Sequence, residues 1–304
     1  LNILQPGQEG GNAVADVLLG KKVPSGKLTD SWAMDYSDYP SAQTFSFKSG
    51  DVFHEEYKEG IYVGYRYFDT FDVPVRYGFG FGLSYTTFSI SSPNVTLTGV
   101  GTENPTLTAE VEVTNTGEQY SGKEVVQVYV SCPQQGLPKE YRRLAGFAKT
   151  KELSPKETQK LTISFPLYQL SSYDESSASW ILDGGNYGIW IGNSLQDAVL
   201  CAVMELDGQA VLISGTNICK PQKRVEEIAP DQEVLLKKQE KWETAAKERN
   251  LPFVQVKAAQ LLTRKIEYKA DYEELTGRAG EIVNSMTPEQ LILLATGDIS
   301  MGQG

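Results

Sequence analysis

Residues 107–117 read LTAEVEVTNTG, and apolar side chains occupy every second position at the start of this stretch. These positions are Leu107, Ala109, Val111 and Val113, which would share one face of an extended strand before the Asn-Thr-Gly turn. Similar alternating runs are KEVVQVYVS, TQKLTISF, ASWIL, YGIWIG and AVLCAVMEL, and RLAGFAKT adds another. About seven short strands in roughly a hundred residues favour an immunoglobulin-like sandwich. We therefore predict a two-sheet, antiparallel sandwich over residues 105–207.

The residues at the start of the chain have the pattern of an α/β unit. In PGQEGGNAVADVLLGKKVPSGKL, apolar residues line one face of a predicted helix over residues 12–19. Gly20 is placed to end this helix in a left-handed conformation. Such a helix packs on a sheet, but only residues 1–5 precede it. We expect its apolar face to be poorly covered within this chain, and exposed apolar surface favours association.

Residues 53–88 are rich in aromatic residues and glycine, and IYVGYRYF alternates as a strand would. The carboxylates near these aromatic residues are Glu55, Glu56, Glu59, Asp69 and Asp72. A sugar-binding site is one interpretation, because pyranose rings stack on aromatic faces. The other interpretation is that large, flat side chains fill a junction between domains, and we favour this one.

Beyond residue 207 the composition becomes more charged. A helix is predicted over residues 231–250, with an apolar stripe that includes Leu235 and Trp242. Another helix is predicted over residues 270–285. Thr-Pro-Glu-Gln at residues 287–290 then has the pattern of a capping box with proline at the first helical position.

Composition limits the partners that the chain is expected to have. Its 304 residues carry a net charge of −11, which disfavours nucleic acid and anionic membranes, because both are bound by clustered Lys and Arg. No stretch has the length and apolar character of a transmembrane helix. Cys132, Cys201 and Cys219 form neither a C-x-x-C pair nor an even disulfide set. We therefore expect reduced thiols in the bacterial cytoplasm.

The motifs that carry chemistry are weak when each is taken alone. GKKVPSGKL lacks the spacing and the Ser or Thr of a phosphate loop, and no strand-to-helix switch follows GFGFGL. His54 is the single histidine of the chain, so it has no partner for a metal site or a serine triad. We expect no metal ion and no cofactor, and the carboxylates match an ordinary acidic surface.

Several longer stretches together resemble glycoside hydrolase family 3. QPGQEGGNAVADVLLGKKVPSGKL, EGIYVGYRYFDTF and YGFGFGLSYTTF resemble the closing part of that family's α/β-sandwich domain. VTNTGEQYSGKEVVQVYVS, RRLAGFAKTKELSPKETQKLTISF and GGNYGIWIGNS resemble the fibronectin type III-like domain that follows in its β-glucosidases. IVNSMTPEQLILLATG, at residues 282–297, resembles the helices that lead into the family's (β/α)8 barrel. The resemblance implies the reversed domain order of some bacterial β-glucosidases, with this chain as an interior piece of a larger enzyme.

This resemblance implies a mixed α/β and β fold in four parts. Residues 1–92 would be the C-terminal part of the α/β-sandwich domain, and residues 93–208 the fibronectin type III-like domain, an immunoglobulin-like β-sandwich. Residues 209–269 would form a linker that contains a helix. Residues 270–304 would be the first helices of the barrel domain.

The resemblance assigns no catalytic residue to this chain. The family's nucleophile is an aspartate on a barrel strand, and its acid/base glutamate precedes the PGQEGG-like turn, so neither is matched here. DSW at residues 30–32 lies in the sandwich segment and is not given the nucleophile's role. Glu9 is interpreted as ordering the start of a helix.

The expected function is a non-catalytic portion of a retaining β-glucosidase, as a scaffold, assembly or pocket-rim element. The complete enzyme would take β-glucosides or oligosaccharides, and this chain would contact the missing barrel and sandwich portions and form homo-oligomers. The alternative is a stand-alone carbohydrate-binding or adhesion module. That alternative requires exposed, coplanar aromatic residues. Tyr129, Trp180 and Trp190 instead fall within alternating strands, where about half of the positions face the core.

Overall fold

The computed structural model describes residues 2–46, 48, 50–51, 53–218, 223–267 and 276–296. The chain forms two compact units, Leu1–Ile266 and Glu267–Gly304. None of the described helices combines the length and the apolar character that crossing a membrane requires.

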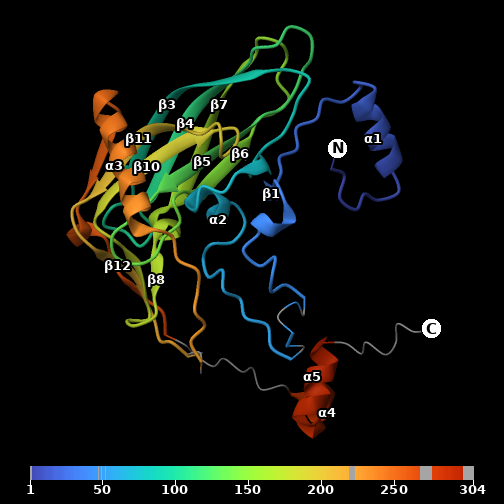
Figure 1. The fold of residues 1–304 in the computed structure, drawn as a ribbon, viewed down its shortest axis with the longest axis vertical. Helices are drawn as coiled ribbons and strands as arrows, with labels where there is room; N and C mark the ends of the chain where they lie inside the picture. Colours follow the sequence, from blue (N-terminus) through green and yellow to red (C-terminus); the bar gives the residue numbers. More distant parts are fainter. Residues whose placement is uncertain are drawn as a thin grey trace. The chain divides into compact units, whose positions relative to one another are not determined.

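The alternating stretch forms β4, Thr106–Asn115, at the centre of the first sheet of the larger unit (Figure 1). It pairs antiparallel with β3, Phe88–Thr98, and with β7, Thr158–Pro166. Leu107, Val111 and Val113 on β4 are at most 1% exposed. One face of the strand is therefore buried in the core, as the alternation predicts.

A second sheet faces the first across this core, with the strand order β13-β11-β10-β5-β6. In that order its strands are Phe253–Val256, Val199–Leu206, Gly185–Gly192, Val125–Ser131 and Arg143–Lys149. Val128, Ile189 and Met204 from this sheet belong to the same core cluster as Leu107 and Phe165 from the first. The predicted antiparallel sandwich is therefore confirmed.

A third, smaller sheet departs from the two-sheet prediction. Its order is β14-β12-β9-β8, with the strands Arg264–Lys265, Ala210–Ser214, Ser179–Leu182 and Ser172–Asp174. The alternating pattern did not reveal β8, which spans three residues. Strands β12, β13 and β14 come from beyond residue 207, where short apolar runs such as AVLI and FVQV pair with the sheets despite the charged surroundings.

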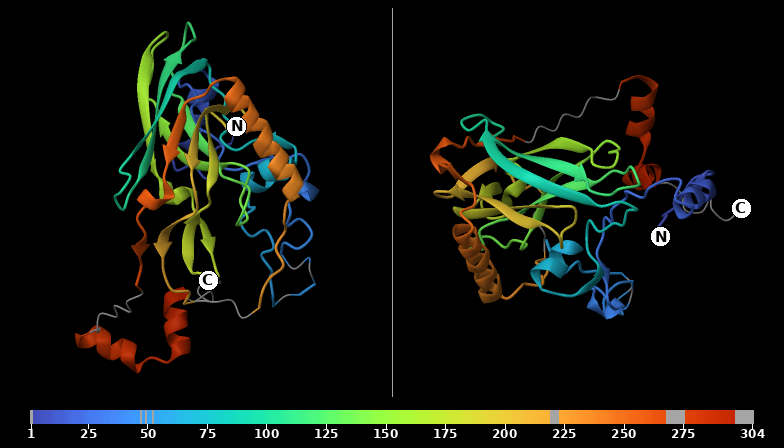
Figure 2. Two further views of the ribbon diagram at one scale, coloured as in Figure 1. Left: turned by 90° about the vertical axis from the view of Figure 1, so that its left-hand side faces the viewer. Right: turned by 90° about the horizontal axis from the view of Figure 1, so that it is seen from above.

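Helix α3, Gln232–Glu248, covers the outer face of the second sheet, as Figure 2 shows. Asp231 caps it by accepting hydrogen bonds from the backbone N–H groups of Glu233 and Val234. Trp242 is 3% exposed and packs in a cluster with Leu200 and Val203 of β11. The predicted helix and its apolar stripe are confirmed.

The N-terminal segment contains helix α1, Gly10–Leu18, and Gly20 follows it with φ +71°. The predicted helix and its left-handed stop are confirmed. Leu18 and Leu19 are 67% and 70% exposed, so the apolar face of α1 is poorly covered, as expected.

The prediction of a strand at IYVGYRYF is wrong. The structure forms helix α2 there, Tyr65–Thr70. Gly64 has φ +58°, which interrupts an extended backbone, and its carbonyl accepts hydrogen bonds from the N–H groups of Tyr67 and Phe68. Tyr65, Tyr67 and Phe68 therefore lie on a helix, and Ile61 and Val63 lie on the segment before it, rather than on the faces of one strand.

The remaining elements of the larger unit are short. They are β1 (Trp32–Ala33), β2 (Val75–Tyr77) and the 3-10 helices η1 (Tyr36–Asp38), η2 (Leu167–Leu170) and η3 (Ala258–Gln260). Strands β1 and β2 pair antiparallel as a two-stranded sheet.

The smaller unit contains α4, Gly277–Ser285, and α5, Pro288–Thr296. The Thr287 N–H donates to Gln290 Oε1 at 2.8 Å, and the Gln290 N–H donates to Thr287 Oγ1 at 3.3 Å. The predicted capping box is therefore confirmed. The first residues of the helix predicted over 270–285 lie outside the described residues.

Replacing Trp242 with Ala is expected to lower the free energy of unfolding by about 3 kcal/mol, because it removes a buried aromatic side chain and leaves a cavity under α3. Urea unfolding of the whole chain measures this change. Lys241→Ala is the matched control, since Lys241 is an exposed neighbour on the same helix. Equal unfolding midpoints for the two variants would contradict the assigned packing.

Candidate functional site

The aromatic, glycine-rich segment docks on the sandwich through a small ring cluster. The Tyr65 ring lies 4.5 Å from that of Phe79 and 6.2 Å from that of Tyr129. Tyr65 also anchors the backbone of β6, since its hydroxyl accepts a hydrogen bond from the Leu144 N–H at 2.9 Å. Tyr129 is 0% exposed. These rings contact one another and the sandwich, which supports the interpretation as a domain junction over that of a sugar site.

A buried ion pair crosses this junction. Arg142 Nε donates to Asp69 Oδ2 at 2.9 Å and Nη2 donates to Asp69 Oδ1 at 2.5 Å, while Nη1 donates to the Leu195 carbonyl at 3.0 Å. The two side chains are only 13% and 11% exposed. Burial opposes the charge on Arg142, but the bonded carboxylate outweighs it and raises the guanidinium pKa above its ordinary value. Such a two-pronged pair fixes orientation as well as distance.

Helix α3 reaches the same point through Lys238. Its ammonium donates to the carbonyls of Asp69 and Thr70 at 3.1 and 3.2 Å and pairs with Asp72 at 2.6 Å. It also lies 4.7 Å from the centre of the Tyr141 ring, over which Arg142 lies at 5.5 Å. The end of α2 is therefore held by the sandwich and by α3 together.

The stretch KEYRR, residues 139–143, supplies further charged contacts that are buried. Lys139 pairs with Asp183 at 2.6 Å, with side chains 1% and 9% exposed. Glu140, whose side chain is 2% exposed, pairs with Arg143 at 2.7 Å and with Arg66 of α2 at 3.5 Å. Burial alone would raise the pKa of Glu140, but the hydrogen bond and charge of Arg143 lower it below the ordinary value.

A tight turn at the end of the aromatic segment completes the junction. Gly80 has φ +79°, and a Cβ at this position would lie 2.1 Å from Gln127 Oε1. Gln127 Nε2 donates to the Gly80 carbonyl at 3.3 Å and to the Asn193 carbonyl at 2.8 Å. Beside it, Lys27 pairs with the buried Glu124 at 2.8 Å. The turn therefore needs glycine both for its conformation and for its closeness to β5.

The five carboxylates named from the sequence do not act as one group. Asp69 and Asp72 are engaged by Arg142 and Lys238, and Glu56 forms ion pairs with Lys58 and Lys223. Glu55 and Glu59 are exposed or partly exposed. His54 is bonded to Asp51 at 2.9 Å. Within the described residues, no cluster of His, Cys, Asp and Glu is arranged to hold a metal ion.

The other residues named from the sequence have structural contacts. Glu9 is the N-cap residue of α1, and its carboxylate accepts a hydrogen bond from the side chain of Asn12 (Nδ2) at 2.6 Å, but it caps no backbone N–H group. Its role in ordering the helix start therefore stays a prediction. Asp30 accepts a hydrogen bond from the Ser31 N–H at 2.8 Å. Cys132 and Cys201 are free thiols, and Cys219 lies outside the described residues.

The aromatic candidates for a binding module separate into two kinds. Tyr129 is buried, and Trp190 is half-buried with its Nε1–H bonded to Ser131 Oγ at 3.0 Å. Trp180 is 41% exposed and lies beside Tyr173 with the ring planes inclined at 55°, so the two rings are not coplanar.

Comparison with known proteins places two parts of the chain. Residues 1–65 match the glycosyl hydrolase family 3 C-terminal domain, and residues 124–195 match the fibronectin type III-like domain. Beta-glucosidase A of Butyrivibrio fibrisolvens is 43% identical over 215 residues, which cover 64% of this chain and 25% of that protein. The beta-glucosidase of Ruminococcus albus is 42% identical over 217 residues, which cover 69% of this chain and 22% of that protein.

Solved structures agree with these relatives. A beta-glucosidase from Paenibacillus barengoltzii matches with a TM-score of 0.67 and 40% identity, over 70% of this chain and 24% of that one. Beta-glucosidase 3B from Thermotoga neapolitana, in complex with α-D-glucose, matches with a TM-score of 0.62 and 38% identity, over 68% of this chain and 28% of that one. The chain belongs to glycoside hydrolase family 3 through its C-terminal and fibronectin type III-like domains. It spans about a quarter of the length of the curated relatives that it matches.

Asp69→Asn and Arg142→Met are each expected to lower the free energy of unfolding by about 3 kcal/mol, because each leaves a buried partner without its counter-ion. The double variant should lose less than the sum of the two losses. Urea unfolding of all three variants measures this coupling. Glu118→Gln is the control, since Glu118 and Lys156 form an exposed pair whose loss should cost below about 0.5 kcal/mol. Additive losses at Asp69 and Arg142 would contradict the pairing.

The lowered pKa of Glu140 predicts a loss of stability in acid. The folded state holds this proton less tightly than the unfolded state, so the stabilisation is present above the ordinary glutamate value of 4.5 and disappears as the pH falls through the lowered folded value. Glu140→Gln should therefore flatten the fall in unfolding free energy between about pH 5 and pH 3. Urea unfolding across this range measures the two slopes. Equal slopes for the variant and the parent chain would contradict the prediction.

Proposed function

We propose that this chain is a non-catalytic scaffold within a retaining β-glucosidase-type enzyme that hydrolyses terminal β-glucosides. The Asp69–Arg142 pair carries this proposal. It joins the segment just after the residues that match the family 3 C-terminal domain to the fibronectin type III-like sandwich by buried, directional bonds.

A fixed junction suits the chemistry of such an enzyme. Retaining glycosidases hold two carboxyl groups about 5–5.5 Å apart, and displacements of about 1 Å between reacting groups reduce rates strongly. By resemblance, both carboxyl groups belong to other parts of the enzyme. Arg142 and Lys238 restrain α2 from two directions, so the sandwich would keep the adjoining α/β domain in one orientation.

The partners follow from the same role. We propose that the barrel domain and the rest of the α/β-sandwich domain contact this chain, and that the complete enzyme takes a β-glucoside or oligosaccharide in carbohydrate metabolism. The exposed Leu18, at the end of α1, and Leu19 after it offer apolar surface for such a contact or for a homo-oligomer. The free thiols of Cys132 and Cys201 support a location in the reducing bacterial cytoplasm.

The scaffold proposal predicts that the purified chain does not hydrolyse an aryl β-glucoside above the background rate, because the resemblance matches neither the nucleophile nor the acid/base of the family to a residue of this chain. A colorimetric assay at high protein concentration measures this rate. The variants Glu55→Ala, Glu56→Ala, Glu59→Ala, Asp69→Ala and Asp72→Ala are assayed beside it. Turnover by the parent chain that disappears in one of these variants would place an active site here and overturn the proposal.

A further inference from the structure

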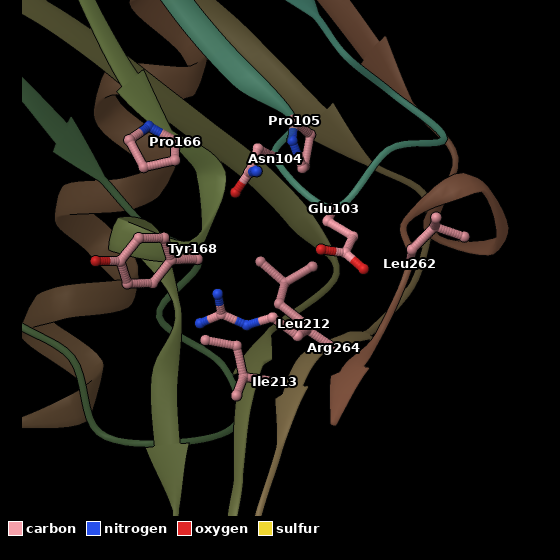
Figure 3. A pocket seen from close by; sticks show the side chains of 9 residues that line it. All are labelled: Glu103, Asn104, Pro105, Pro166, Tyr168, Leu212, Ile213, Leu262 and Arg264. Carbon is pink, nitrogen blue, oxygen red and sulfur yellow. The ribbon is translucent and has the colours of Figure 1, made fainter. Parts of the chain in front are cut away.

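A pocket of about 140 Å³ lies on the sandwich among residues that the junction does not use (Figure 3). It is bounded by the turn before β4, the end of β7, η2, β12 and the segment that leads into β14. Its lining residues are Glu103, Asn104, Pro105, Pro166, Tyr168, Leu212, Ile213, Leu262 and Arg264. Elements far apart in the sequence therefore converge on one hollow.

The floor of the pocket is apolar because of an irregularity in β12. Val211 pairs with Ile181 and Ile213 with Trp180, so Leu212 is an extra residue in the strand. Leu212 and Ile213 both line the pocket and are 5% and 7% exposed. The bulge thus turns two adjacent apolar side chains towards the same hollow.

The rim of the pocket carries polar side chains that are not engaged elsewhere. Figure 3 shows the Glu103 carboxylate, the Arg264 guanidinium and the Tyr168 ring around the apolar floor. Among the residues that the structure describes, the side chains of Glu103, Asn104 and Arg264 have no hydrogen-bond or ion-pair partner. An acceptor, a donor and an amide that does both are therefore free to bind a ligand.

An exposed aromatic pair continues the pocket along the same sheet. Tyr173, Trp180, Ile213 and Arg264 are successive partners across β8, β9, β12 and β14. Residues directly opposite each other in a sheet share a face, so Trp180 lies on the strand next to the pocket floor. Trp180 and Tyr173 are 41% and 39% exposed, with ring centres 5.3 Å apart.

We propose that this pocket and the Tyr173–Trp180 pair form a subsite for a short, neutral oligosaccharide. A pyranose ring combines apolar C–H faces with hydroxyl groups that both donate and accept hydrogen bonds. The aromatic rings and the Leu212–Ile213 floor match the apolar faces, and Glu103, Asn104 and Arg264 match the hydroxyl groups.

The charge and the size of the pocket select this ligand class. One carboxylate and one guanidinium leave the rim without net charge, so an ionic ligand would gain little from it. The volume is below the roughly 300–1,000 Å³ of pockets that enclose drug-sized ligands, so one sugar ring would enter. The next would stack on Trp180 alone, because the Tyr173 ring is inclined to it by 55°. The subsite binds without catalysis and does not depend on the proposed scaffold role.

Binding is tested on the whole chain with cellotetraose, laminaritetraose and xylotetraose, and with tetragalacturonate as an anionic comparison. Saturation-transfer difference NMR detects the contact, and titration calorimetry gives the Kd. We expect a Kd of about 1 mM for at least one neutral tetrasaccharide, because the site is shallow and only part of the ligand is enclosed. Absence of binding to all three neutral sugars, or binding to tetragalacturonate alone, overturns the proposal.

Variants then locate the bound sugar. Trp180→Ala should weaken binding by about tenfold, and Trp180→Phe should retain most of it because the ring face is kept. Glu103→Ala and Arg264→Ala should each weaken it by about threefold, and both residues are exposed and unpaired, so the fold is preserved. Phe147→Ala on β6, where Phe147 is 68% exposed, and Glu112→Ala on β4 are the controls.

The pattern among these variants decides between a site and general adsorption. Weaker binding that is confined to the Trp180→Ala, Glu103→Ala and Arg264→Ala variants supports the subsite. An equal loss in Phe147→Ala, or unchanged binding in all the pocket variants, overturns it. Circular dichroism of each variant confirms that the fold is retained, and the aryl β-glucoside assay addresses the scaffold proposal separately.

Discussion

The buried ion pair between Asp69 and Arg142 is the contact on which the arrangement of the larger unit depends. Arg142 binds the carboxylate with two N–H groups, donates a third to the Leu195 carbonyl, and lies 5.4 Å from the centre of the Trp190 ring. Apolar packing alone tolerates sliding, because its strength follows buried area rather than direction. A two-pronged bond between buried charges has one geometry. The junction is therefore specified in orientation as well as affinity.

The N-terminal segment, residues 2–46, depends on the sandwich for its order more than the sandwich depends on this segment. The sandwich has its own extended apolar core, with Leu107, Val128 and Ile189 all 0% exposed. Residues 2–46 have little comparable core, and Ala42 is the buried apolar residue among them. This segment therefore takes its order from contacts with the sandwich, including Lys27 with Glu124 and the Ser25 carbonyl with Lys149. Such a division suits a domain that supports others.

Local patterns in the sequence predicted the elements whose causes are local. The alternation of β4, the stripe of α3, the left-handed Gly20 and the Thr287 capping box depend on residues a few positions apart. The candidate site was less predictable, because its contacts join residues far apart in the chain. KEYRR has the composition of a solvated surface, yet its charges are buried against partners in α2 and in the β9–β10 turn. The strand prediction at IYVGYRYF failed for a local reason, because Gly64 has a positive φ and a helix begins after it.

The segment after residue 207 connects the junction with the pocket, although its composition is that of a linker. Lys238 on α3 binds the end of α2, while Leu262 and Arg264, further along the same segment, line the pocket. Between them, β13 pairs in parallel with β11, from Val203 opposite Phe253 to Leu206 opposite Val256. This pairing fixes the segment on the sandwich between its two contacts, because a shift of one residue would reverse which side chains face the core. A displacement of α3 at the junction would therefore have to break or strain the β13 ladder before it could reach the pocket. The sandwich thus keeps the two features mechanically separate while one continuous stretch of chain contributes to both.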